Sequence, residues 1–194
     1  YWKLMGAGNG LVSGAIQDGT ASLNLAKTGT GTWTLSASNT YTGGTVVNGG
    51  TLVASYHLDS NLTNNALGMM VPSNVVTVNS GGVLTGPYNN WADNVSSPTD
   101  GSASHTYVVN AGGIIRNGSP AITGLGNLTL NGGTLEVNNG WGSWNAAYVL
   151  LGDVTVGGTT PSNITRPGTS AANIRLTSST GNRTFNVANA TGGG

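Results

Sequence analysis

The acidic residues are the first place to look for catalysis or metal binding, and this chain has only six of them: Asp18, Asp59, Asp93, Asp100, Glu136 and Asp153. Cleavage of a polysaccharide needs carboxyl groups close together, and Ca²⁺ needs several oxygen ligands. Asp93 and Asp100 form the only near pair, and no Asp-x-Asp spacing supports a Ca²⁺ loop. Aspartate often solvates and caps turns. We therefore regard both residues as weak metal candidates and predict no catalytic residue, no metal site and no cofactor.

The two histidines, His57 and His105, are far apart in the sequence, and each lies beside a polar segment. A catalytic or metal-binding histidine needs converging partners, and the sequence shows none. We therefore expect both side chains to face solvent. The chain contains no cysteine, which excludes disulfides and thiolate metal sites.

Four aromatic residues lie in segments that interrupt the regular pattern of the chain: Tyr88, Trp91, Trp141 and Trp144. Aromatic rings stack on sugars and anchor protein interfaces, so these residues are candidates for contact with a carbohydrate or a partner. The alternative, which we favour, is that they cover the core where an insertion joins the regular chain. Trp33 alternates with Leu35 and is expected to pack in or beside the core.

Charged residues make up only 6% of the 194 residues, against roughly 25% in a typical soluble domain. The formal net charge is zero and the six basic residues are scattered, whereas nucleic-acid binding needs clustered Lys and Arg. Glycine is abundant, with 33 residues, but the chain is also rich in β-branched residues, which disordered segments lack. The composition favours a folded all-β protein that binds no nucleic acid. No apolar run approaches the roughly 20 residues of a membrane-spanning helix, so we expect membrane contact only through regions outside this chain.

One short unit recurs along the chain: an alternating apolar strand, an asparagine, two glycines and a second strand. The four clear copies contain Asn48, Gly49 and Gly50; Asn79, Gly81 and Gly82; Asn110, Gly112 and Gly113; and Asn131, Gly132 and Gly133. With a degenerate copy that ends at Gly158, the second glycines are 32, 31, 20 and 25 residues apart. About 20 residues is the length of one coil of a solenoid. The longer steps indicate either a coil with an inserted loop or an additional weak coil.

The unit has a simple physical explanation. Alternate residues such as Val76 and Val78 face the same side of a strand, and only stacked coils can bury that side. Glycine allows the positive φ of a tight corner, and stacked asparagines can form a hydrogen-bonded ladder. We therefore predict an all-β fold, a right-handed parallel β-helix (β-solenoid) with loop insertions near residues 56–74, 86–104 and 138–147. Residues 61–70 are expected to form a loop with at most one helical turn.

Residues 23–52 contain a more specific pattern. They include Lys27-Thr28-Gly29, then Asn39-Thr40-Tyr41, then Asn48-Gly49-Gly50-Thr51-Leu52. This stretch closely resembles the autotransporter-associated β-strand repeat, also called the passenger-associated transport repeat. The resemblance implies the passenger or stalk β-helix of a large exported bacterial protein, and it implies no catalytic residues. Beyond residue 52 it weakens to a repeat-like similarity.

We interpret residues 1–194 as a single β-solenoid segment, a fragment of a larger secreted or cell-surface bacterial protein. Its expected role is structural and non-enzymatic, in a passenger or stalk that supports adhesion or the extracellular matrix. Two alternatives stay open: a self-assembling extracellular fibre subunit, whose open ends stack end to end, and a carbohydrate-binding or polysaccharide-degrading β-helix. The expected partners are further copies of the chain and cell-surface or matrix glycans.

Overall fold

The computed structural model describes residues 1–56, 64–93, 104–118, 122–137, 146–166, 173–176 and 185–187. These residues form twenty β-strands and no helix, so nothing in this part of the chain could cross a lipid bilayer as a helix. The strands are β1 (Trp2–Leu4), β2 (Gly10–Val12), β3 (Leu25–Lys27), β4 (Thr32–Leu35), β5 (Thr45–Val47), β6 (Gly50–Ala54), β7 (Asn64–Asn65), β8 (Gly68–Met69), β9 (Val75–Val78), β10 (Gly82–Gly86), β11 (Thr106–Asn110), β12 (Ile114–Asn117), β13 (Thr123–Leu125), β14 (Asn127–Asn131), β15 (Thr134–Glu136), β16 (Ala146–Leu150), β17 (Val154–Gly157), β18 (Asn163–Thr165), β19 (Asn173–Leu176) and β20 (Phe185–Val187).

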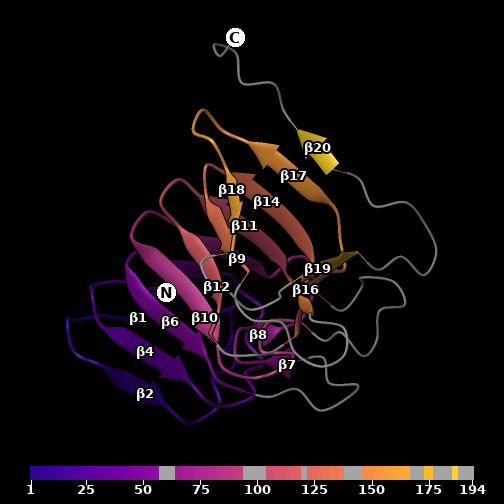
Figure 1. Cartoon of the computed structure of the whole chain (residues 1–194). Helices are drawn as coiled ribbons and strands as arrows, with labels where there is room; N and C mark the ends of the chain where they lie inside the picture. The colour runs from indigo at the N-terminus through magenta and orange to yellow at the C-terminus, as the bar shows by residue number, and fades with distance from the viewer. Residues whose placement is uncertain are drawn as a thin grey trace.

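Two long sheets run along the molecule, from the indigo N-terminal strands to the orange C-terminal strands in Figure 1. The first sheet has the order β1-β3-β5-β9-β11-β14-β17-β20, and the second has the order β2-β4-β6-β10-β12-β15-β18. Every pairing in these two sheets is parallel. The chain passes from one sheet to the other and back, so each pair of strands belongs to one coil. The predicted parallel β-solenoid is confirmed.

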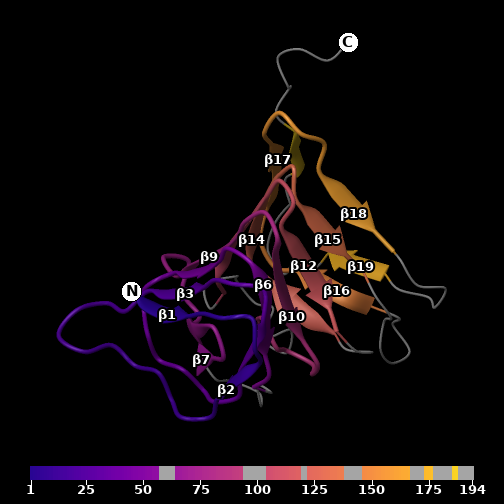
Figure 2. The same cartoon turned by 90° about the vertical axis from the view of Figure 1, so that its left-hand side faces the viewer.

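The third side of the coils is less regular. In the C-terminal part it is a sheet of three strands, β13-β16-β19. Figure 2 shows β16 and β19 beside β12 and β15. In the N-terminal part it consists of loop segments that still bond from coil to coil. The N–H of Thr40 donates to the Ile16 carbonyl, and the N–H of Asn39 donates to the Asn65 carbonyl, both at 2.9 Å. This side carries the insertions.

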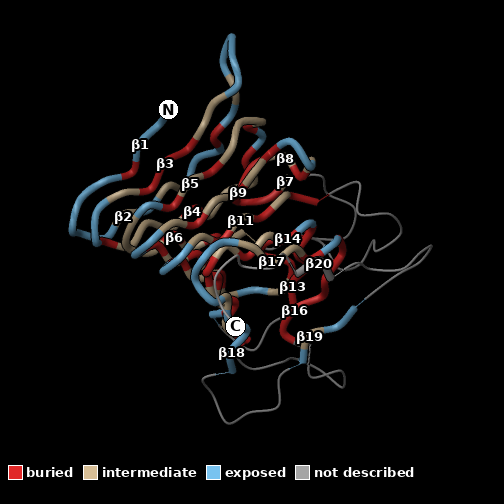
Figure 3. Tube along the Cα trace, turned by 90° about the horizontal axis from the view of Figure 1, so that it is seen from above, coloured by how far each residue is buried: buried red, intermediate tan, exposed pale blue. Residues whose placement is uncertain are grey.

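The core lies inside the coils, where the trace is buried in Figure 3. Side chains alternate along each strand, and in β9 the buried positions are Val76 and Val78. Parallel pairing places these two beside Tyr107 and Val109 of β11, which are also buried. The buried faces of successive strands therefore stack from coil to coil and form one continuous hydrophobic cluster. Each fully buried aliphatic side chain contributes about 1.5–3 kcal/mol, so stability accumulates along the stack.

The long steps between repeats are single coils with a longer third side. Val76 of β9 lies directly between Thr45 of β5 and Tyr107 of β11 in the first sheet, so no additional coil is present. In the first long coil, β7 and β8 form an antiparallel hairpin. Asn65 Oδ1 accepts a hydrogen bond of 2.6 Å from the N–H of Leu67 in its turn. The described residues 64–70 therefore contain this hairpin and not the helical turn allowed for that segment.

Candidate functional site

The repeated Asn-Gly-Gly units form corners between the first and second sheets. One glycine of each unit has a positive φ, between 62° and 79°: Gly50, Gly81, Gly112 and Gly132. A Cβ atom on Gly50 would also lie 2.5 Å from the Gly29 carbonyl oxygen of the neighbouring coil. Both the backbone conformation and the close approach of the next coil therefore require glycine. Within the repeated units, Gly82, Gly113 and Gly133 also face a carbonyl oxygen of the neighbouring coil.

The asparagines of the four units form a hydrogen-bonded ladder along the outside of the corners. Asn79 Nδ2 donates to Asn48 Oδ1 at 2.7 Å, and Asn110 Nδ2 donates to Asn79 Oδ1 at 2.7 Å. Asn131 Nδ2 continues the ladder to Asn110 Oδ1 at 3.3 Å. The ladder predicted from the sequence is therefore present. It links residues that are 31, 31 and 21 positions apart, so it tolerates insertions elsewhere in the coil.

Lys27 makes a buried polar contact that the sequence analysis missed. It ends β3 at an inward-facing position beside Val47 of β5, and its side chain is fully buried. Its Nζ donates hydrogen bonds to the carbonyl oxygens of Thr28 (3.0 Å), Gly29 (2.9 Å) and Gly49 (2.8 Å). An ammonium group has three donors, so all are used, and they tie two successive corners together. Burial lowers the pKa of Lys27, because desolvation disfavours the charged form.

Asn39 and Tyr41 hold the third side of the same two coils. Asn39 Oδ1 accepts from the N–H of Ile16 at 2.8 Å, and its Nδ2 donates to the Ala66 carbonyl at 2.7 Å. The buried Asn39 thus bridges the preceding and the following coil. The Tyr41 hydroxyl lies 2.7 Å from Thr45 Oγ1 in the core, and burial raises the pKa of Tyr41 far above its usual value.

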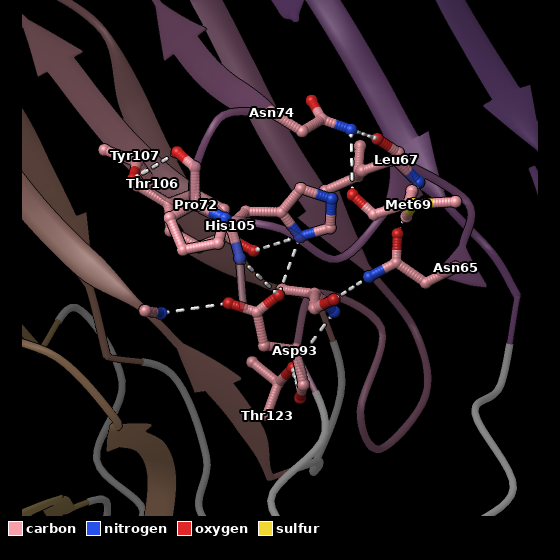
Figure 4. Close-up of polar contacts among 12 residues, drawn as sticks. Asn65, Leu67, Met69, Pro72, Asn74, Asp93, His105, Thr106, Tyr107 and Thr123 are labelled. Atoms are coloured by element: carbon pink, nitrogen blue, oxygen red, sulfur yellow. Dashed lines mark hydrogen bonds and ion pairs between the residues drawn. The ribbon is translucent and has the colours of Figure 1, made fainter. Parts of the chain in front are cut away.

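Asp93 and His105 form a buried pair where the second insertion meets the coils (Figure 4). His105 Nδ1 donates to Asp93 Oδ1 at 2.7 Å, and the backbone N–H of His105 donates to the same oxygen at 3.2 Å. The histidine ring also packs edge-on against Tyr107, with the ring centroids 5.9 Å apart. The expectation that His105 faces solvent is therefore wrong, because a carboxylate within the fold supplies its polar partner. His57 lies outside the described residues.

Hydrogen bonds made by Ala92 and Asp93 join the insertion to the neighbouring coils. Asp93 exchanges two backbone hydrogen bonds with Gly124, of 3.1 and 2.8 Å. Asn65 Nδ2 donates to the Ala92 carbonyl, and the N–H of Ala92 donates to Thr123 Oγ1 at 3.0 Å. Asn65 belongs to the coil before the insertion and Thr123 to the coil after it, and both are drawn near Asp93 in Figure 4. The cluster therefore positions the chain, and its side chains are buried.

The structure does not support Asp93 as a metal ligand. Besides the two bonds to Oδ1, the N–H of Gly126 donates to Asp93 Oδ2 at 2.9 Å, so N–H donors occupy both oxygens. Asp100, the other candidate, lies outside the described residues. Within the described part of the chain no group of three or more His, Cys, Asp or Glu side chains could hold a metal ion.

The aromatic candidates divide between exposed and buried positions. Trp91 is fully buried, and its Nε1 donates to Asn117 Oδ1 at 3.3 Å. Its assignment as a carbohydrate contact is therefore corrected: the indole covers the core beneath the insertion, which was the alternative favoured from sequence. Tyr88 is 48% exposed and can still contact a ligand. Trp141 and Trp144 lie outside the described residues.

Comparison with known protein families points to the coils built around Lys27, Asn39 and Tyr41. A family model described as the passenger-associated-transport-repeat matches residues 25–54. The chain contains a passenger-associated-transport-repeat. No curated protein and no solved structure matches the chain.

The passenger-associated-transport-repeat corresponds to two coils of the solenoid. It begins with β3 and ends with β6, so it contributes two strands to each long sheet. Lys27 joins the two corners within the repeat, and Asn39 and Tyr41 hold its third side. Within the matched residues, Lys27, Asn39 and Tyr41 therefore serve to pack one coil against the next.

Proposed function

We propose that this chain is a structural stalk segment in the passenger of an exported bacterial surface protein, where it supports adhesion or the extracellular matrix. The observation that carries the proposal is the match of a transport repeat to two coils of a continuous solenoid. In a solenoid each coil contacts only its neighbours. Additional coils therefore lengthen the rod, which suits a segment that holds other regions away from a cell surface.

A non-enzymatic role is supported by the condition of the ionisable side chains. Asp93 and His105 are buried against each other, and Glu136 is paired with Arg116 on the outer face of the second sheet. The Asp93–His105 pair is buried and so lies out of reach of a substrate, and Glu136 has an arginine as its partner. Among the candidates for contact with surface or matrix glycans, Tyr88 has the exposed ring that such contact requires.

Surface display tests the proposal. The chain, joined to an autotransporter translocator and an epitope, is expected to be labelled by antibody on intact cells and to resist external protease. Lys27→Met should increase protease sensitivity, because three carbonyl acceptors lose their donor. Lys3→Met is the matched control, since Lys3 is exposed. Labelling that requires cell lysis would refute the proposed location, and a wild-type level of resistance in Lys27→Met would refute the role of the repeat in folding the stalk.

A further inference from the structure

Asparagine followed by glycine is a reactive pair, because the glycine nitrogen can attack the side-chain amide carbon without hindrance from a Cβ atom. The chain contains five such pairs, at Asn9-Gly10, Asn48-Gly49, Asn117-Gly118, Asn131-Gly132 and Asn139-Gly140. The last pair lies outside the described residues. The other four pairs differ in whether the glycine N–H and the asparagine side-chain amide are hydrogen-bonded to other groups.

In two of the pairs the glycine N–H donates a hydrogen bond. The N–H of Gly132 donates to Ser162 Oγ at 2.9 Å, and Asn131 Nδ2 donates into the ladder. The N–H of Gly118 donates to a carbonyl of the neighbouring coil at 3.2 Å, and Asn117 is fully buried. In each pair the attacking nitrogen must first lose a hydrogen bond, and loss of one ordinary hydrogen bond slows a reaction by about tenfold. In the pair Asn9-Gly10, Gly10 lies within strand β2, where it pairs with Trp33 of β4.

In the pair Asn48-Gly49, neither the glycine N–H nor the asparagine Nδ2 is hydrogen-bonded to a described residue. Gly49 lies between β5 and β6, and its N–H has no hydrogen-bond acceptor among the described residues. Asn48 is exposed at the end of the ladder. Its Oδ1 accepts the 2.7 Å bond from Asn79, whereas its Nδ2, the group that must leave, has no hydrogen-bond partner among the described residues. The nucleophile and the leaving group are therefore both free.

Two neighbouring groups favour the reaction. Asn79 Nδ2 donates to the carbonyl oxygen that becomes negatively charged when the amide carbon is attacked, and a donor at this position stabilises the intermediate. The Lys27 ammonium lies 2.8 Å from the Gly49 carbonyl oxygen. A buried positive charge beside Gly49 favours loss of the proton from its N–H. Asn79 is thus a catalytic residue, and Lys27 acts through the local field.

We propose that Asn48 is a self-modification site, at which the folded protein converts its own asparagine into aspartate or isoaspartate. The Gly49 nitrogen gives its proton to hydroxide or water and attacks Cγ of Asn48. A nitrogen–carbon bond forms, the bond from Cγ to Nδ2 breaks, and ammonia leaves with a proton from solvent. Water then opens the five-membered succinimide at either carbonyl. The net change replaces ammonia with water, without oxidant or enzyme, and places a carboxylate at the end of the ladder.

Peptide mapping by mass spectrometry tests the proposal on the purified folded chain during incubation at mildly alkaline pH. We expect Asn48 to convert at least about tenfold faster than Asn131 and Asn117. In denaturant, where all glycine N–H groups are free, the three sites should convert at similar rates. The proposal is overturned if Asn131 or Asn117 converts as fast as Asn48 in the folded chain. It is also overturned if Asn48 stays unmodified in the folded chain while it converts in the denatured chain.

Two variants separate the chemistry from the fold. A Cβ atom on Gly49 would meet no atom closer than 3.5 Å, and Gly49 has no positive φ. Gly49→Ala should therefore keep the unfolding midpoint while slowing conversion of Asn48 by about tenfold or more. Asn79→Ala removes the oxyanion donor and should slow conversion by roughly tenfold. Unchanged conversion in a folded Gly49→Ala variant would refute the succinimide route, and faster conversion in Asn79→Ala would refute the role of Asn79.

Discussion

Three tyrosine side chains are buried in the core, and their hydroxyl groups have different surroundings. The Tyr41 hydroxyl lies 2.7 Å from Thr45 Oγ1, and the Tyr107 hydroxyl lies 3.5 Å from His105 Nδ1. The Tyr148 hydroxyl has no hydrogen-bond partner within the described residues. A buried hydroxyl without a partner opposes folding, whereas a bonded one recovers most of the lost hydration. The phenols of Tyr41 and Tyr148 therefore contribute to stability with opposite signs.

Phenylalanine substitutions should reveal this difference. Tyr41→Phe is expected to lower the free energy of unfolding by about 1–2 kcal/mol, because the buried Thr45 hydroxyl loses its partner. Tyr148→Phe removes a hydroxyl that has no hydrogen bond to the described residues, and it should leave stability unchanged or raise it by up to about 1 kcal/mol. Urea unfolding followed by circular dichroism measures both values. Equal losses in the two variants would contradict the assigned hydrogen bonding.

At the scale of the elements, the corner between the first and second sheets combines two different requirements. The backbone turns at a glycine of positive φ, such as Gly112. The asparagine side chain outside the same corner joins the ladder, in which Asn110 both donates and accepts, while the terminal Asn48 only accepts. The turn is a property of one coil, whereas the ladder exists only between coils.

The ladder should therefore be most sensitive at its interior. Asn110→Ala removes two hydrogen bonds and is expected to lower the free energy of unfolding by about 1–3 kcal/mol. Asn48→Ala removes only one and should cost about half as much. Thermal and urea unfolding of the two variants give the comparison. If both variants match the wild type, then solvent replaces the ladder bonds at no cost.

For the whole molecule, a few buried groups set the dependence of stability on pH. Burial raises the pKa values of Tyr41, Tyr107 and Tyr148 above 10, mainly because the ionised phenol is desolvated. Lys27 shows the opposite shift, since burial lowers its pKa below 10.5. The unfolded chain exposes all four groups, which then titrate near their ordinary values.

The protein should consequently lose stability above about pH 10. There the unfolded chain releases phenolic protons that the folded chain keeps, so each tyrosine lowers the free energy of unfolding by about 1.4 kcal/mol per pH unit. Between its lowered pKa and 10.5, Lys27 adds stability as pH rises, because the unfolded chain then binds more protons. Three tyrosines outweigh this single lysine at the alkaline end. Urea unfolding at increasing pH, together with tyrosinate absorbance, tests the profile; buried phenols that ionise before unfolding would contradict it.

Sequence reasoning succeeded wherever a local pattern repeats. The alternation of Val76 and Val78 predicted a buried face, and the recurrent asparagines predicted the ladder, because stacking repeats the same environment in every coil. Lys27 was missed although its alternation with Leu25 placed it on the inward face of β3, since a lysine is rarely fully buried without a carboxylate partner. Its partners are backbone carbonyl oxygens, which every residue carries, so no residue type in the sequence indicates them.

By itself the sequence determined the solenoid class, the glycine corners and the asparagine ladder, since each follows from period, φ preference and side-chain chemistry within a short unit. Only the tertiary structure determined that Trp91 and His105 are buried. Both lie next to an insertion, and their burial depends on how that insertion folds back onto coils many residues away. The same holds for Asn48 and Asn131, which share an Asn-Gly-Gly sequence but differ in whether a distant hydroxyl holds the glycine N–H. Unlike the corners and the ladder, which follow from a unit repeated in successive coils, the contacts of an insertion depend on residues far away in the chain.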